Sequence, residues 1–140
     1  MSIVLSVDPG VMTGWATWSD RLLVVGQAEF DPFVRYVVTL AEEDQLHVIV
    51  CERYTITGET LKKSRQSASL EVIGFLKSVG VVYDIPVILQ TPADAKRFAT
   101  DAKLTAAGWK LPSTQDHAND ALRHLMLYLV KERMMEPPRV

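Results

Sequence analysis

The chain has 140 residues and a mass of 15.7 kDa, close to the commonest size of one domain, so we expect a single domain over residues 1–140. With 48% hydrophobic and 23% charged residues, the composition excludes a disordered, collagen-like or coiled-coil chain. The net charge of −2 conceals an uneven distribution, because residues 1–52 carry two basic and eight acidic side chains and residues 53–110 carry nine and five. This basic middle third would suit a phosphate backbone, although charge alone favours an ordinary solvated surface.

Two further classes are excluded by short stretches of the sequence. No apolar run is long enough to cross a membrane, and Ile3–Val7 lacks the length and basic flank of a signal peptide, so we expect a cytoplasmic protein without a membrane partner. The single cysteine, Cys51, excludes an internal disulfide and a multi-cysteine zinc site. A metal would therefore need oxygen and imidazole ligands.

The first thirty residues predict three antiparallel strands. Residues 3–7 form a β-branched run that ends at Asp8, before the turn-forming Pro9-Gly10. Residues 12–18 and 22–28 supply two more strands around a Ser-Asp turn. A helix then begins at Asp31-Pro32 and presents an apolar face through residue 41.

The middle of the chain predicts two more strands separated by a helix. Residues 47–52 are a continuous apolar run that, like the first strand, ends in a carboxylate, Glu52. A polar, basic loop covers residues 55–65, an apolar stripe predicts a helix over residues 66–80, and residues 85–90 form the fifth strand. The overall pattern is a mixed sheet flanked by helices, an α/β fold.

The C-terminal third predicts two helices. Thr91 is a suitable cap and Pro92 a suitable first residue for a short helix, whereas residues 96–112 are polar without a clear element. Ser113 and Asp116 fit a capping box for a last helix with an apolar face over residues 118–130, ended by Pro137-Pro138.

Chemistry-bearing side chains collect around two strand ends and one helix. Asp8 and Glu52 end strands that would be neighbours, and open sheets bind ligands beyond the carboxyl ends of their strands. On the last helix His117, Asp120 and His124 are spaced for one flank, and Asp116 lies one position away. If that helix crosses the same sheet end, the ligands converge on divalent cations such as Mg²⁺ or, with an imidazole, Mn²⁺. Two ions about 4 Å apart can cleave a phosphodiester.

Each of these residues also has a plainer interpretation. Asp8 before Pro-Gly is a common turn former, Glu52 can be simply solvated, and His117 and His124 can be surface residues of an amphipathic helix. We interpret Cys51 as inert core and His47 as a surface residue. The joint pattern favours the metal site.

Three motifs resemble the RuvC family of Holliday junction resolvases: Val7-Asp8-Pro9-Gly10 with Thr13-Gly14, then Cys51-Glu52, then Asp116 to Leu122. The resemblance extends to element order over most of the chain, and the short length is most similar to compact bacteriophage members. It implies an RNase H-like mixed sheet of five strands, three antiparallel then two parallel, flanked by helices. It also implies a metal-dependent, structure-selective endonuclease that cleaves four-way DNA junctions, in the host cytoplasm if the protein is viral.

The resemblance further implies a set of ligands for two Mg²⁺ or Mn²⁺ ions. The family's catalytic positions match Asp8, Glu52, His117 and Asp120. As a hypothesis, Asp8 bridges both ions, Glu52 and Asp120 each hold one, and His117 either supports these ligands from a second layer or binds a metal directly. Most relatives have Asp where His117 stands, which leaves the choice of metal open. Whether Asp116 or His124 also binds metal is left open as well.

Basic residues flank the expected site on both sides, and we expect them to hold DNA phosphates. They are Lys62, Lys63 and Arg65 after Glu52, and Lys96, Arg97, Lys103 and Lys110 before the last helix. Tyr54 is near enough to stack on an unpaired base, or else is a half-buried strand-end residue.

Cutting two opposed strands of a junction calls for two active sites related by a twofold axis, so we expect a homodimer. The candidate patch is the helix over residues 66–80, where Leu70 and Ile73 extend the apolar surface beyond one sheet-facing stripe. A broad core face is the alternative.

Other functions remain open. A nuclease of the same fold could act on RNA, RNA–DNA hybrids or other branched DNA. A sugar-kinase-like ATPase shares the opening Asp-Pro-Gly and Thr-Gly turn but needs a second phosphate loop and an adenine pocket, which this sequence does not suggest. A non-catalytic junction-binding module would tolerate loss of the metal-ligating side chains, whereas this sequence keeps one at each of the four positions.

Overall fold

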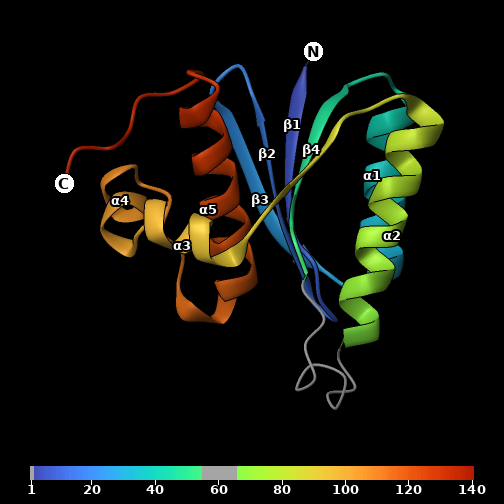
Figure 1. Cartoon of the computed structure of the whole chain (residues 1–140), viewed down its shortest axis with the longest axis horizontal. Coiled ribbons are helices and arrows are strands. Elements are labelled where there is room, and N and C mark those ends of the chain that lie inside the picture. Colours follow the sequence, from blue (N-terminus) through green and yellow to red (C-terminus); the bar gives the residue numbers. More distant parts are fainter. Residues whose placement is uncertain (1, 55–65) are drawn as a thin grey trace.

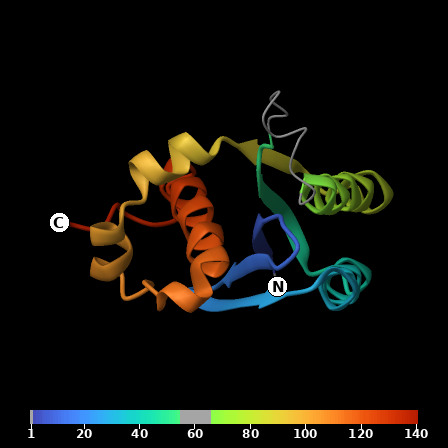
Figure 2. The same ribbon diagram turned by 90° about the horizontal axis from the view of Figure 1, so that it is seen from below.

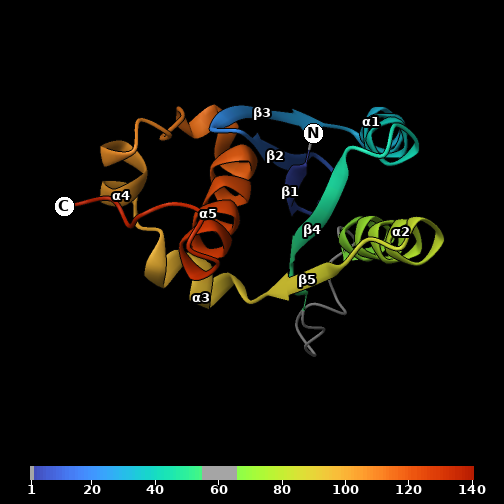
Figure 3. The same cartoon turned by 90° about the horizontal axis from the view of Figure 1, so that it is seen from above.

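The computed structural model describes residues 2–54 and 66–140, and within them five strands form one sheet in the order β3-β2-β1-β4-β5 (Figure 3). The strands are β1 (Ile3–Asp8), β2 (Thr13–Ser19), β3 (Leu22–Ala28), β4 (Leu46–Glu52) and β5 (Val87–Gln90). The first three pair antiparallel, and β1–β4 and β4–β5 pair parallel. The predicted α/β, RNase H-like sheet is therefore confirmed.

Helices cover both faces of the sheet (Figure 1). One face carries α1 (Phe30–Glu42) and α2 (Gln66–Tyr83). The other carries α5 (Asp116–Lys131), beside which lie α3 (Pro92–Phe98) and α4 (Asp101–Ala106). Because β1 lies in the middle of the sheet and is covered on both sides, all six of its residues are buried.

Two apolar clusters, one on each face, hold these layers together. Phe33 and Val37 of α1 and Leu76 of α2 pack on one face with Ile49 and Cys51. Leu122, Leu125 and Leu129 of α5 pack on the other with Val4 and Val50. Cys51 is buried and His47 is exposed, as the sequence predicts.

The middle helix departs from expectation in two ways. It continues three residues past Gly80, to Tyr83, because Gly80 is a point of close approach and not a helix stop: a Cβ there would press against Val87 and the carbonyl of Ile85. Ile73, expected on an outer apolar surface, is only 8% exposed and belongs to the core under α2, whereas Leu70 is 40% exposed.

The C-terminal third of the chain differs from the sequence-based predictions at two further points. Thr91 does cap α3 and accepts from the backbone of Asp94, but α4 was not predicted; it begins after a second cap, Thr100. The capping box of Ser113 and Asp116 is wrong, because Ser113 lies in a short 3-10 turn, η2 (Ser113–Gln115), that precedes α5.

The last helix, α5, ends at Lys131, several residues before the prolines predicted to end it. The other strand and helix ends lie within one or two residues of the predictions. In the parts of the chain that the structure describes, no helix is long and apolar enough to cross a membrane.

Candidate functional site

Two of the expected carboxylates emerge at the same edge of the sheet. Asp8 ends β1 and Glu52 ends β4, and these strands pair in parallel with Val7 opposite Cys51. Helix α5 begins at this same edge, which Figure 2 views from below. The expected meeting of strand ends and last helix is therefore found.

Asp8 is the most enclosed of these carboxylates, at 6% exposure. Its Oδ2 lies 3.0 Å from Nδ1 of His117, whose side chain is half exposed. The pKa of Asp8 is raised to about 9, chiefly by burial and also by the negative charges of Glu52 and Asp120, while Lys96 opposes the shift. Acidic groups thus crowd around Asp8.

The first turns of α5 are held against the sheet by contacts that position His117 and Asp120. Gly14 pairs with Asp8 across β1 and β2, and a Cβ on Gly14 would collide with the backbone carbonyl of His117. Ser6 donates a 2.7 Å hydrogen bond to the carbonyl of Ala121, and Gln27 of β3 accepts from the backbone N–H of Ala118. The Gln27 amide thus replaces the missing cap at the start of α5.

Glu52 is held by a buried histidine of α5. Its Oε1 lies 3.3 Å from Nε2 of His124, and Nδ1 of the same ring lies 2.9 Å from Oε1 of Gln90. Gln90 ends β5 and pairs with Glu52 in the sheet. His124, whose metal binding the sequence left open, thus bridges two strand ends.

Asp120 has a partner that sequence reasoning missed. Arg123 approaches it at 3.4 Å, donates to the carbonyl of Ala99 at 2.7 Å and pairs with Asp101. The i,i+3 spacing of Asp120 and Arg123 could have signalled the first contact, but no sequence pattern indicated the others. The guanidinium therefore ties Asp120 to the α3–α4 junction.

A polar cavity of about 560 Å³ opens beside Asp120. Three cations and three acids line it: Lys96, Lys110, Arg123, Asp101, Asp116 and Asp120. Asp116 thus lies near the site, but none of its described contacts is with Asp8 or Glu52. The cavity gives a charged ligand access to Asp120.

The expected phosphate-binding residues are placed unevenly. Lys96 is exposed and lines the cavity beside Asp120, and Arg97 is also exposed. The Lys103 ammonium lies 4.0 Å above the ring of Phe98, and Tyr54 is half-buried against the apolar cluster under α2. Lys62, Lys63 and Arg65 fall outside the described residues.

The donor set fits hard divalent cations. The buried Asp8 beside other carboxylates is costly to ionise unless a positive ion offsets the crowded charge, and oxygen with imidazole suits Mg²⁺ or Mn²⁺. Among residues 2–54 and 66–140, no group of three or more His, Cys, Asp or Glu side chains is arranged to hold one ion. Convergence of all four expected ligands stays a prediction.

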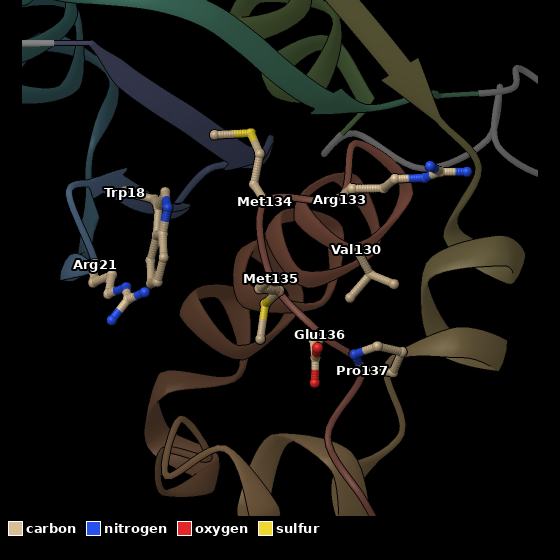
Figure 4. A pocket seen from close by; sticks show the side chains of 8 residues that line it. All are labelled: Trp18, Arg21, Val130, Arg133, Met134, Met135, Glu136 and Pro137. Carbon is tan, nitrogen blue, oxygen red and sulfur yellow. The ribbon is translucent and has the colours of Figure 1, made fainter.

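The largest cavity described, about 810 Å³, lies elsewhere (Figure 4). It is lined by Trp18 and Arg21 near the β2–β3 turn and by the residues that end α5 and follow it. Trp18 pairs with Val4 near the start of β1, so this cavity lies toward the end of the sheet opposite Asp8. It therefore takes no part in the carboxylate site.

Comparison with known proteins was informative only at the level of structure. No protein-family model and no curated protein matches the chain. A structure of Thermus thermophilus RuvC in complex with a Holliday junction substrate superposes with a TM-score of 0.70 at 13% identity, covering 100% of both chains. The fold is that of RuvC. A second Thermus thermophilus RuvC structure gives a TM-score of 0.60 at 15% identity, covering 96% of this chain and 99% of that one. Neither is a phage protein, so the expected likeness to phage members stays a prediction.

Proposed function

We propose that the protein is a metal-dependent, structure-selective endonuclease that cleaves four-way DNA junctions. The observation that carries the proposal is the meeting of Asp8, Glu52 and the start of α5 at one sheet edge of a RuvC fold. One similar structure holds a Holliday junction substrate, which favours branched DNA as the substrate here.

Four side chains would hold the metal: Asp8, Glu52, His117 and Asp120. Bound there, Mg²⁺ or Mn²⁺ supplies an activated water and positive charge for the leaving oxygen of a phosphodiester. Asp8 provides a buried carboxylate that His117 orients through its 3.0 Å contact. Arg123 fixes Asp120, and Lys96 adds positive charge where a phosphate would approach.

The direct test compares substrates. Purified protein is incubated with a four-way junction, a flap, an RNA–DNA hybrid and plain duplex, each with Mg²⁺ or Mn²⁺. We expect paired cuts in the junction and little cleavage of duplex. Preferential cleavage of the hybrid would instead identify an RNA-directed nuclease. Cleavage that is equally fast in EDTA would contradict the proposed metal dependence.

The matched variant is Asp8→Asn, which keeps the shape of the side chain. We expect cleavage to fall at least about a hundredfold, since a lost charged ligand weakens metal binding more than a lost supporting contact does. Junction binding should be unchanged or tighter, because a negative charge facing phosphates is removed. Wild-type cleavage by Asp8→Asn would contradict the site.

We further propose that the protein acts as a homodimer through α2, which brings two active sites to one junction. The outer side of α2 exposes Leu70 at 40% and Val81 at 83%, while Ile73 is unsuitable because it is core. Leu70→Glu with Val81→Glu should give a folded monomer in sedimentation that nicks one strand. A double variant that remains dimeric and cuts in pairs would place the interface elsewhere.

A further inference from the structure

His124 is almost completely buried at the carboxylate edge, at 1% exposure. It projects from α5 between the ends of β4 and β5, and both ring nitrogens have oxygen-bearing partners. Such a side chain is not needed for packing alone, since the neighbouring buried positions Leu122, Leu125 and Met126 are apolar.

The chemistry of the groups decides which of them donates in the hydrogen bonds that link Gln90, His124 and Glu52. An ionised carboxylate only accepts hydrogen bonds, so Nε2 of His124 must carry the proton that faces Glu52. The Gln90 amide has both a donor and an acceptor end, so it can satisfy Nδ1 whether or not that nitrogen carries a proton. Gln90 thus holds the imidazole, and the imidazole holds one oxygen of Glu52.

We propose that His124 is a positioning residue that orients the Glu52 carboxylate for metal binding, with Gln90 as its support. This inference rests on the metal role given to Glu52 in the proposed function. Groups that hydrogen-bond to metal ligands typically change metal affinity or activity by about 10–100-fold when they are removed. Glu52, with a side chain 17% exposed, has limited water to replace the lost donor.

The test measures Mn²⁺ binding by the DNA-free protein, from the loss of the free Mn²⁺ signal in electron paramagnetic resonance, alongside junction cleavage. His124→Leu removes the donor, and we expect about tenfold or greater weakening of Mn²⁺ binding with a parallel rise in the metal concentration for half-maximal cleavage. His124→Gln restores a donor near the Nε2 position and should remain within about threefold of wild type.

Two further variants complete the comparison. His47→Leu makes the same change at the exposed histidine of β4 and should leave binding and cleavage as they are. Gln90→Leu removes only the support, so we expect a smaller loss than with His124→Leu. It also provides the decisive measurement should His124→Leu fail to fold.

The outcomes separate this inference from the proposed function. Weakened Mn²⁺ binding in His124→Leu, together with a wild type that binds Mn²⁺ but leaves junctions intact, would keep the positioning role and overturn the junction nuclease. Wild-type binding by folded His124→Leu, or by Gln90→Leu where the former does not fold, would overturn the positioning role. So would His124→Gln behaving like His124→Leu, or a wild type that binds no Mn²⁺.

Discussion

The two faces of the sheet differ in the balance of their contacts. On the α5 face, buried polar groups make directional bonds across elements, as Ser6 does to Ala121 and Gln27 to Ala118. On the face covered by α1 and α2, apolar packing dominates, with Phe33 and Phe75 edge to face at 6.3 Å, and Ser69 of α2 adds one buried bond to the carbonyl of Pro9. The catalytic candidates on a helix all belong to the directional face, where a shift of the helix would break specific bonds. We therefore expect changes there to affect the site, and changes on the other face to affect stability.

We expect the largest loss of cleavage from a substitution at Gly14, where an added Cβ atom would push the start of α5 away from the sheet. Gly14→Ala adds a Cβ that collides with the backbone of His117 and Ala118, so the start of α5 must move away from Asp8. We expect cleavage to be lost and Mn²⁺ binding to weaken more than tenfold, measured on protein that remains helical by circular dichroism.

Gly74→Ala is the matched control, because nothing lies within 4 Å of the added Cβ on α2. It should stabilise the helix by about 0.5–1 kcal/mol and leave metal binding unchanged. Equal behaviour of the two variants would show that α5 has room at Gly14 and that the comparison of faces is wrong there.

The buried Asp8 predicts an unusual pH dependence of the metal-free protein. Its pKa rises from 3.8 to about 9 on folding, chiefly through burial. The folded state therefore binds this proton more tightly than the unfolded state, and stability falls as pH rises from about 4 toward 9, by up to about 1.4 kcal/mol per unit. Urea unfolding of wild type and Asp8→Asn at several pH values measures the difference. A stability difference between them that is flat with pH would contradict this assignment.

On the opposite face, Phe33→Ala should act on stability alone. Phe33 is fully buried between α1 and the sheet, and truncating such a ring typically costs about 3–5 kcal/mol. We expect a lower midpoint in urea with Mn²⁺ affinity of the folded protein unchanged. Val34, half-buried next to it on α1, gives the control Val34→Ala with a much smaller loss. Weakened metal binding in folded Phe33→Ala would show that the two faces are coupled.

Sequence patterns predicted the elements whose signals are local. Apolar runs gave the strands that end at Asp8 and Glu52, and Thr91 with Pro92 gave the start of α3. The placement of both carboxylates at one edge followed from strand order alone. These features depend on neighbours in sequence or on general rules of sheet topology, so a single sequence contains them.

The features that were missed depend on residues far apart in the chain. The cap of α5 comes from Gln27, 91 residues before its partner Ala118, so the local pattern at Ser113 was misleading. The role of Arg123 toward Ala99 and the burial of Ile73 likewise depend on how α5 and α2 pack. The predicted helix ended at Gly80, although this glycine marks a close approach of α2 to β5.

The smallest predicted effect concerns the hydroxyl of Ser6 in the middle of β1. This hydroxyl is fully buried and donates at 2.7 Å to the carbonyl of Ala121, one residue after Asp120. Ser6→Ala removes the bond without adding volume, and we expect a loss of about 1 kcal/mol in urea unfolding. Because the bond ties α5 to the strand that ends at Asp8, cleavage should also fall by a few fold.

Ser78→Ala makes the same change on the other face, where the exposed hydroxyl donates to the carbonyl of Gly74 within α2. That bond competes with water and joins no second element, so its loss should change stability by less than about 0.5 kcal/mol and leave cleavage unchanged. If directional bonds to α5 position the site, only Ser6→Ala alters cleavage at temperatures where both variants are folded. Equal cleavage by the two variants would mean that apolar packing alone sets the position of Asp120.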